Sequence, residues 1–129
     1  MKLLVAYDKN TSTSKVLDKA LKRAKESSAY VYLVRTCDSD LKEREIRELE
    51  HRLNEIREEV FKKHGIDSEV HILIRGLSPG EDIVQYAYEK DVDEIIIGIK
   101  KRSKVEKMVF GSTAQYVILE AHCPVLTVK

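Results

Sequence analysis

Short apolar runs alternate along this chain with longer segments in which apolar residues recur every three or four positions. Near-continuous apolar runs of this length are typical of strands that are buried on both faces of a parallel sheet. Strand and helix alternate without exception, which predicts an α/β domain with a mainly parallel sheet and right-handed crossovers. No linker or internal repeat interrupts this order, so residues 1–129 are expected to form a single domain. The five runs are Leu3–Tyr7, Ala29–Val34, Val70–Ile74, Glu94–Ile97 and Val125–Val128.

The most charged segment lies between the second and third runs, over about residues 40–64, and it also carries a regular apolar stripe. Gly65 follows the stripe and predicts the end of a helix there, because the left-handed residue after a last turn is usually glycine. The stripe spans about two heptads, so a coiled-coil seam stays open as an alternative, but we favour a helix that packs on the sheet. His71 and Arg75 near the third run favour an edge position for that strand. The stripe consists of Ile46, Leu49, Leu53, Ile56 and Val60.

Local signals predict where the other helices begin and end. Ser14 is expected to cap the first helix. Ser78-Pro79-Gly80-Glu81 matches a capping box with proline at the first helical position, which predicts the start of the third helix. Cys123-Pro124 is expected to end the last helix, whose inward stripe includes Ile118, and to open the last strand.

Charge and cysteine content exclude several classes of protein. The formal net charge is only +1, so neither nucleic acid nor a membrane is expected as a partner. Cys37 and Cys123 lie at no metal-ligand spacing and are too few for a disulfide framework, which favours reduced thiols in the cytoplasm. The first apolar run is too short for a signal peptide or a membrane span. None of the four histidines pairs at ligand spacing, so no metal-binding residues are expected.

The residues that follow each run are the candidate ligand site, because ligands bind such sheets outside the carboxyl ends of the strands. They are Asp8, Thr36, Gly76 and Gly98 onward. Thirteen residues after Gly98, Gly111 is followed by Ser112 and Thr113 at the start of the last helix. A helix N-terminus presents unpaired N–H groups and a partial positive charge, so this combination predicts an anion site with phosphate as its natural ligand. The alternative is an ordinary loop-to-helix start, where serine and threonine are common.

The last third of the chain resembles the nucleotide-binding end of the universal stress protein family. That family's pattern is Gly, two residues, Gly, nine residues, Gly and then Ser or Thr, and Gly98, Gly111 and Ser112 match its first, third and last positions. The closing Cys-Pro-Val-Leu-Thr-Val and the opening Val-Ala-Tyr-Asp are also similar, so the resemblance covers essentially the whole chain. It implies a five-stranded, three-layer α/β/α fold like that of adenine nucleotide alpha hydrolases, with strand order 3-2-1-4-5. It also implies a homodimer formed through the last strand.

The resemblance assigns a role to each position that matches the family. Asp8 would lie beside the adenosine, Thr36 would contact adenine through its backbone, and Gly76 would lie near the ribose or the base. The phosphates would be surrounded by Gly98, Lys101, Gly111, Ser112 and Thr113.

Lys101 departs from the family, which has its middle glycine at this position. A Cβ there is costly if the backbone φ is positive, and this favours a chain that does not bind nucleotide. The same side chain brings a cation to the place where phosphate charge would lie, and a cluster of such cations can hold a triphosphate. A solvated basic loop is the remaining interpretation. The cations of this loop are Lys100, Lys101, Arg102, Lys104 and Lys107.

The resemblance therefore implies a regulatory protein of the stress response that binds ATP or AMP, with Mg²⁺ accompanying ATP, and that acts on a regulatory protein partner. The alternative is a universal stress protein that acts as a dimeric interaction module without nucleotide. A small-molecule enzyme that uses the same crevice is a third, less favoured hypothesis. No nucleophile, base and orienting group can be assembled from the sequence, so catalysis is not expected and any hydrolysis of ATP would be slow.

Overall fold

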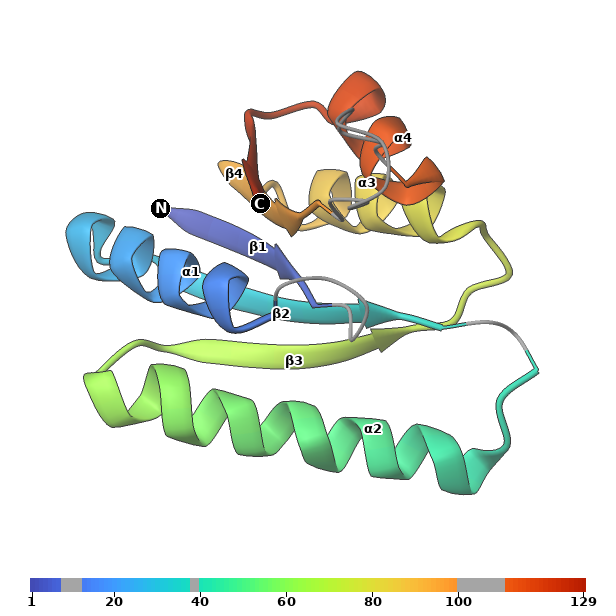
Figure 1. Ribbon diagram of the computed structural model, residues 1–129, viewed down its shortest axis with the longest axis horizontal. Helices are drawn as coiled ribbons and strands as arrows, with labels where there is room; N and C mark the ends of the chain where they lie inside the picture. Colours follow the sequence, from blue (N-terminus) through green and yellow to red (C-terminus); the bar gives the residue numbers. More distant parts are fainter. Residues whose placement is uncertain (8–12, 38–39, 100–110) are drawn as a thin grey trace.

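The computed structural model describes residues 1–7, 13–37, 40–99 and 111–129. Strands and helices alternate along the chain in the order predicted from the apolar runs (Figure 1). The elements are β1 Lys2–Ala6, α1 Thr13–Ser27, β2 Tyr30–Thr36, α2 Glu43–Ile56, η1 Arg57–Phe61, η2 Lys62–His64, β3 Ser68–Leu73, α3 Pro79–Glu89, β4 Glu94–Gly98, α4 Ser112–Glu120 and β5 Val125–Val128. The ends of each predicted run differ from the ends of the observed strand by at most two residues.

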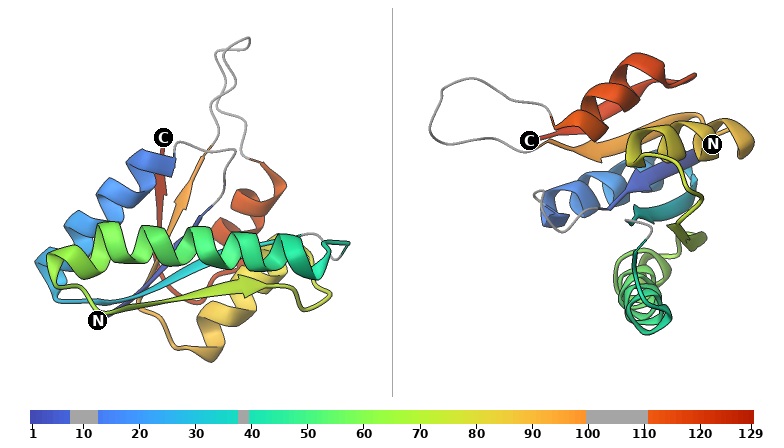
Figure 2. Two further views of the ribbon diagram at one scale, coloured as in Figure 1. Left: turned by 90° about the horizontal axis from the view of Figure 1, so that it is seen from below. Right: turned by 90° about the vertical axis from the view of Figure 1, so that its right-hand side faces the viewer.

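All five strands are parallel and lie in the order β3-β2-β1-β4-β5. The central strand is β1, in which Leu4 lies opposite Tyr32 of β2 and Ile95 of β4. Helices α1 and α2 cover one face of the sheet, and α3 and α4 cover the other (Figure 2). The predicted fold class and strand order are confirmed, as is the edge position of β3. Because the strands are parallel, their carboxyl ends all lie at one edge of the sheet.

Two cores lie on opposite faces of the sheet, and β1 contributes to both. Leu3 and Val5 belong to the core under α1 and α2, whereas Leu4 and Ala6 belong to the core under α3 and α4. Leu3, Leu4 and Val5 have no exposed surface. Burial of one such side chain contributes about 1.5–3 kcal/mol, so both faces of the strand must be apolar. This explains why the strands appear in the sequence as continuous apolar runs rather than as alternating ones.

The charged helix packs on the sheet, as favoured over the coiled-coil alternative. Leu53, Ile56 and Phe61 are buried in the same core as Leu3 and Val31. The helix is not uniform, because α2 passes into a π-helical turn, η1, and then into a 3-10 turn, η2. Its end at the glycine predicted from the sequence is confirmed, since that residue is left-handed with φ 74°.

The predicted cap of α1 is wrong, whereas the predicted start of α3 at Pro79 is confirmed without the hydrogen bonds of a capping box. Helix α1 already begins at Thr13, so Ser14 lies in its first turn rather than at the N-cap position. Ser78 is the N-cap of α3, with φ −63° and ψ 154°, but its side chain caps no backbone N–H. Its hydroxyl instead donates to the Glu81 carboxylate at 2.9 Å. A hydrogen bond to an ionised acceptor is stronger than one between neutral groups, which explains why the capping box does not form.

The last helix is shorter than predicted. It ends at Glu120, and Ala121 is already extended with φ −65° and ψ 144°. Cys123-Pro124 therefore precedes β5 but does not end the helix. Ile118, which was expected to face inward, is 39% exposed, whereas Val117 is fully buried. Proline prevents a helix from continuing through it and disfavours the helical conformation at the residue before it, but it does not keep the preceding residues helical.

Three helical segments end with a residue in the left-handed region: Ser28 with φ 51°, Gly65 with φ 74° and Asp91 with φ 51°. After each of them, the next amide donates to a carbonyl five positions back, at 3.1, 2.9 and 3.1 Å respectively. These bonds define Schellman motifs, which satisfy carbonyls that the helix leaves unpaired. Only one of the three motifs has glycine, so Ser28 and Asp91 carry a steric cost of about 1 kcal/mol each.

Helices α3 and α4 approach each other closely at Gly80. A Cβ at this position would lie 2.8 Å from Cβ of Tyr116, 3.0 Å from its Cδ1 and 3.1 Å from its Cγ. Real Cβ atoms do not approach other carbons this closely, so the contact requires glycine in α3. The pair fixes how α4 lies on the sheet, and thereby where its N-terminus points.

Candidate functional site

The site residues predicted from the sequence fall at the carboxyl edge of the sheet where the structure describes them. Thr36 is the last residue of β2 and pairs with Leu73 of β3, and Gly98 is the last residue of β4 and pairs with Val128. Gly76 follows β3 after a short interval. Asp8 and Lys101 lie outside the described residues, in the intervals 8–12 and 100–110.

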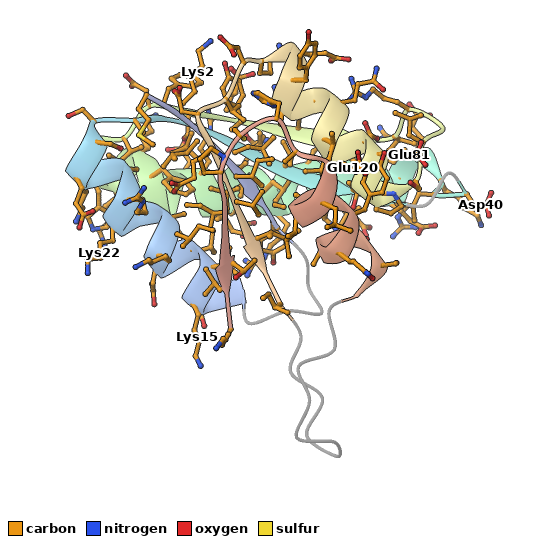
Figure 3. All side chains as sticks on the ribbon, turned by 90° about the horizontal axis from the view of Figure 1, so that it is seen from above. Lys2, Lys15, Lys22, Asp40, Glu81 and Glu120 are labelled. Atoms are coloured by element: carbon orange, nitrogen blue, oxygen red, sulfur yellow. The ribbon has the colours of Figure 1, made fainter. Side chains whose placement is uncertain are left out.

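The carboxyl edge also receives the start of two helices. Lys15, in the first turn of α1, lies at this edge, whereas Lys2, at the start of β1, lies at the opposite one (Figure 3). Helix α4 begins here at Ser112, directly after Gly111. The strand order reverses between β1 and β4, and sheets of this kind bind ligands at the carboxyl ends of the strands on either side of such a reversal.

No side chain of the described residues caps the N-terminus of α4. Its N-cap residue, Gly111, is extended with φ −61° and ψ 158°. The carbonyl of Gly111 accepts the first helical bond from the amide of Gln115, at 3.0 Å. No acidic residue lies in the first turn, and Gly111 and Ser112 are exposed. The first amides of a helix lack intrahelical partners and carry a partial positive charge, so this end is suited to an external anion.

Two of the three glycines predicted to contact a ligand, Gly76 and Gly111, differ in whether the backbone requires glycine. Gly76 has φ 74°, a conformation that side chains rarely adopt, so its backbone explains its identity. Gly111 has an ordinary φ, and no heavy atom of the described residues lies within 4 Å of the position that a Cβ would take. Neither conformation nor packing against described residues requires glycine at 111. Among the described residues, nothing occupies the position that a side chain at 111 would take.

Arg75 lies beside Gly76 but is engaged by carboxylates of α3. Its guanidinium hydrogen-bonds to Asp82 and Glu89 and lies over the ring of Tyr86, 5.7 Å from the centroid. Burial alone would lower the pKa of Arg75, but the bonds to Asp82 and Glu89 raise it above its ordinary value. This arginine is therefore a permanent cation that is already paired. The sequence prediction missed it, although Arg75, Asp82 and Glu89 recur at intervals of seven residues.

Other chemistry-bearing groups of the described residues do not add to this site. In the ranges 1–7, 13–37, 40–99 and 111–129, no three or more His, Cys, Asp or Glu side chains are grouped to hold a metal ion. No helix in the same ranges is long and apolar enough to cross a membrane. Burial raises the pKa of the Cys123 thiol, and the charges of Asp93 and Glu94 raise it further, so this cysteine stays protonated.

Comparison with known proteins decides the family. The model of the universal stress protein family matches residues 1–129. The chain belongs to the universal stress protein family. This confirms the resemblance inferred from Gly98, Gly111 and Ser112. Among curated relatives, a universal stress protein of Methanocaldococcus jannaschii is 29% identical over 99% of this chain and 81% of its own length.

Solved structures of universal stress proteins share the fold over the full chain. One from Archaeoglobus fulgidus is 37% identical, covers 100% of this chain and 98% of its own, and superposes with a TM-score of 0.85. Another from Archaeoglobus fulgidus, solved in complex with dAMP, is 34% identical with the same coverage and a TM-score of 0.81. A universal stress protein can therefore hold an adenine nucleotide on this architecture.

Proposed function

We propose that this universal stress protein binds an adenine nucleotide, AMP or ATP, at the carboxyl edge of its sheet and acts as a cytoplasmic regulatory protein in the stress response. The observation that carries the proposal is the N-terminus of α4, which no described side chain caps and which begins after a glycine that neither φ nor described neighbours require. The relative solved with dAMP supports an adenine nucleotide as the ligand.

The described residues divide into two groups along this edge. Gly111, Ser112 and Thr113 lie at the N-terminus of α4, where amides and hydroxyls would donate to phosphate oxygens. Thr36 ends β2 and Gly76 follows β3, both on the other side of β1 from α4, which suits them to the base and the ribose. By resemblance to the family, Asp8 would meet the adenosine and Lys101 the phosphates. The helix end favours an anion by about 0.3–1 kcal/mol at an exposed position, so further contacts must supply most of the affinity.

The proposed role is binding rather than catalysis. Thr36, Gly76, Gly98 and Gly111 carry no side chain that could serve as a general base near neutral pH. Phosphoryl transfer needs an oriented nucleophile as well as charge stabilisation, so hydrolysis of ATP is expected to be slow. Mg²⁺ would accompany ATP through the phosphates and water rather than through a set of protein ligands.

We also propose that the protein is a homodimer that pairs through β5. β5 is an edge strand, and all four of its residues, Val125–Val128, are only half-buried. An unpaired apolar edge favours pairing with a second strand, and a two-fold dimer would pair β5 with itself. Nucleotide occupancy would alter the surface that the dimer offers to a regulatory protein partner. The second candidate function, a dimeric interaction module without nucleotide, retains this edge and requires no ligand.

Titration calorimetry with AMP and with ATP·Mg²⁺ separates the two candidates. Wild-type protein is expected to bind, and a ligand at a hundred times its Kd raises the unfolding free energy by about 2.7 kcal/mol, which a thermal shift also detects. The variant Gly111→Val is expected to lose binding while the dimer stays intact, and Gly111→Ala serves as the milder matched control. If the wild type shows no heat and no thermal shift at millimolar nucleotide, nucleotide binding is refuted and the interaction-module function is favoured.

A further inference from the structure

The segment that joins β3 to α3, residues 74–78, lies at the carboxyl edge of the sheet. It leaves the sheet directly beside the end of β2, where Thr36 pairs with Leu73 and the amide of Cys37 donates to the Leu73 carbonyl at 3.3 Å. Gly76 turns the segment through the left-handed region. The segment is therefore the neighbour of Thr36 on the side of the site proposed for the base and ribose.

Arg75 fastens this segment to α3 with three hydrogen bonds. Its Nε donates to Oδ1 of Asp82 at 2.6 Å and its Nη2 donates to the carbonyl of Asp82 at 3.2 Å. Its Nη1 donates to Oε2 of Glu89 at 2.8 Å. The Asp82 side chain is 2% exposed and the Arg75 side chain is 33% exposed, so the contact is largely shielded from water. The bonds use the fork geometry of the guanidinium and hold it in one orientation.

We infer that Arg75 and Asp82 are positioning residues for the nucleoside half of the site, because they hold the turn at Gly76 in the place where a base or ribose would meet it. This inference rests on the proposed function. Neither residue needs to touch the ligand. When the pair is removed, the turn samples other conformations. The apparent affinity for the nucleoside then falls in proportion to the population of the conformation that can bind it.

The effect should depend on which half of the ligand is present. The phosphates are proposed to bind at the N-terminus of α4, and the contact of α4 with α3 at Gly80 and Tyr116 does not involve Arg75. Inorganic tripolyphosphate should therefore be indifferent to the pair, whereas AMP and adenosine should not. A pair that served only to stabilise the fold would produce no such difference between ligands.

The test variant is Arg75→Met/Asp82→Leu, which removes both charges, because removal of one partner alone would leave a buried charge unpaired. The matched control is Arg23→Met/Glu94→Leu. Arg23 binds Glu94 through two bonds of 3.1 and 2.7 Å, with side chains 37% and 11% exposed, so the two pairs are similar in kind. Glu94 is the first residue of β4, so the control pair lies at the opposite edge of the sheet.

Titration calorimetry of the full-length protein with adenosine, AMP and tripolyphosphate gives the readout. We expect the test variant to bind AMP and adenosine about tenfold more weakly and tripolyphosphate within about twofold of wild type, since a tenfold fall corresponds to a competent turn populated about a tenth of the time. The control should bind all three ligands as wild type does. Should the test variant not fold, Arg75→Lys keeps the charge opposite Asp82 but loses the fork, and the same ligand selectivity is expected with a smaller loss.

Four results would overturn the inference. Equal losses for AMP and tripolyphosphate would assign the pair a purely structural role, as would equal losses of AMP affinity in the test and control variants. Unchanged AMP affinity in both Arg75 variants would show that the turn does not need the pair. Failure of wild-type protein to bind any of the three ligands would overturn the proposed function, and this inference with it.

Discussion

The close contact between Gly80 and Tyr116 predicts that the effect of Gly80→Ala on stability changes sign when the Tyr116 side chain is removed. In Gly80→Ala the new Cβ would lie 2.8 Å from Cβ of Tyr116, so α3 and α4 must move apart. Overpacking of this kind costs about 1–3 kcal/mol. Exchange of glycine for alanine within a helix gains up to about 1 kcal/mol, which offsets part of that cost. We therefore expect Gly80→Ala to destabilise the protein by about 1–2 kcal/mol.

A double-mutant cycle with Tyr116→Gly isolates the steric part. Tyr116→Ala would leave the nearest atom, Cβ, in place, whereas Tyr116→Gly removes all three close atoms. In that background Gly80→Ala should stabilise the protein by about 0.5–1 kcal/mol, because only the gain in helix propensity remains. Urea denaturation measures the unfolding free energy of each variant. The expected coupling energy of roughly 2 kcal/mol is well above the deviation from additivity seen for independent sites. Equal destabilisation by Gly80→Ala in both backgrounds would refute the steric explanation.

Three further predictions concern residues outside the site. Asp91→Gly should raise the unfolding free energy in urea by about 0.5–1 kcal/mol, because Asp91 has φ 51°; no gain would argue against strain there. Tyr86→Phe should leave stability unchanged or raise it, because the Tyr86 hydroxyl is buried without a hydrogen-bond partner among the described residues; a large loss would contradict this. Burial alone would raise the pKa of Glu69, but hydrogen bonds from His71 and Tyr30 hold this pKa below its ordinary value of 4.5. Ionised Glu69 therefore adds its full stabilisation above pH 4.5, and this stabilisation is lost as pH falls through the lower pKa of the folded state. When the unfolding free energy is measured against pH, the values for wild type and Glu69→Gln should converge below that folded-state pKa.

The order of elements could be predicted from the sequence because burial on both faces leaves a direct mark on it. Continuous apolar runs gave the strands, and Gly65 marked the end of the charged helix. Ser28 and Asp91 adopt the same left-handed conformation without glycine. Both residues are exposed, and the hydrogen bonds of their Schellman motifs accompany this conformation. The glycine that marks Gly65 in the sequence is therefore missing at these two helix ends.

The site was predictable only in part, for a related reason. Strand ends and the start of α4 follow from the alternation of elements, so Thr36, Gly76, Gly98 and Gly111 were placed at the correct edge. The pairing of Arg75 with Asp82 depends on how α3 folds back over the turn, which the sequence does not show. The contributions of Asp8 and Lys101 remain predictions.

The most direct test of the central claim is an amide-resolved NMR titration of the ¹⁵N-labelled protein with AMP. If the N-terminus of α4 holds the phosphate, the amides of Gly111, Ser112 and Thr113 should shift in proportion to occupancy, with the Kd that calorimetry gives. The amide of Gly65, which caps a helix in a different part of the fold, should stay in place. Saturable binding of AMP that leaves the three amides of α4 unmoved would contradict the account.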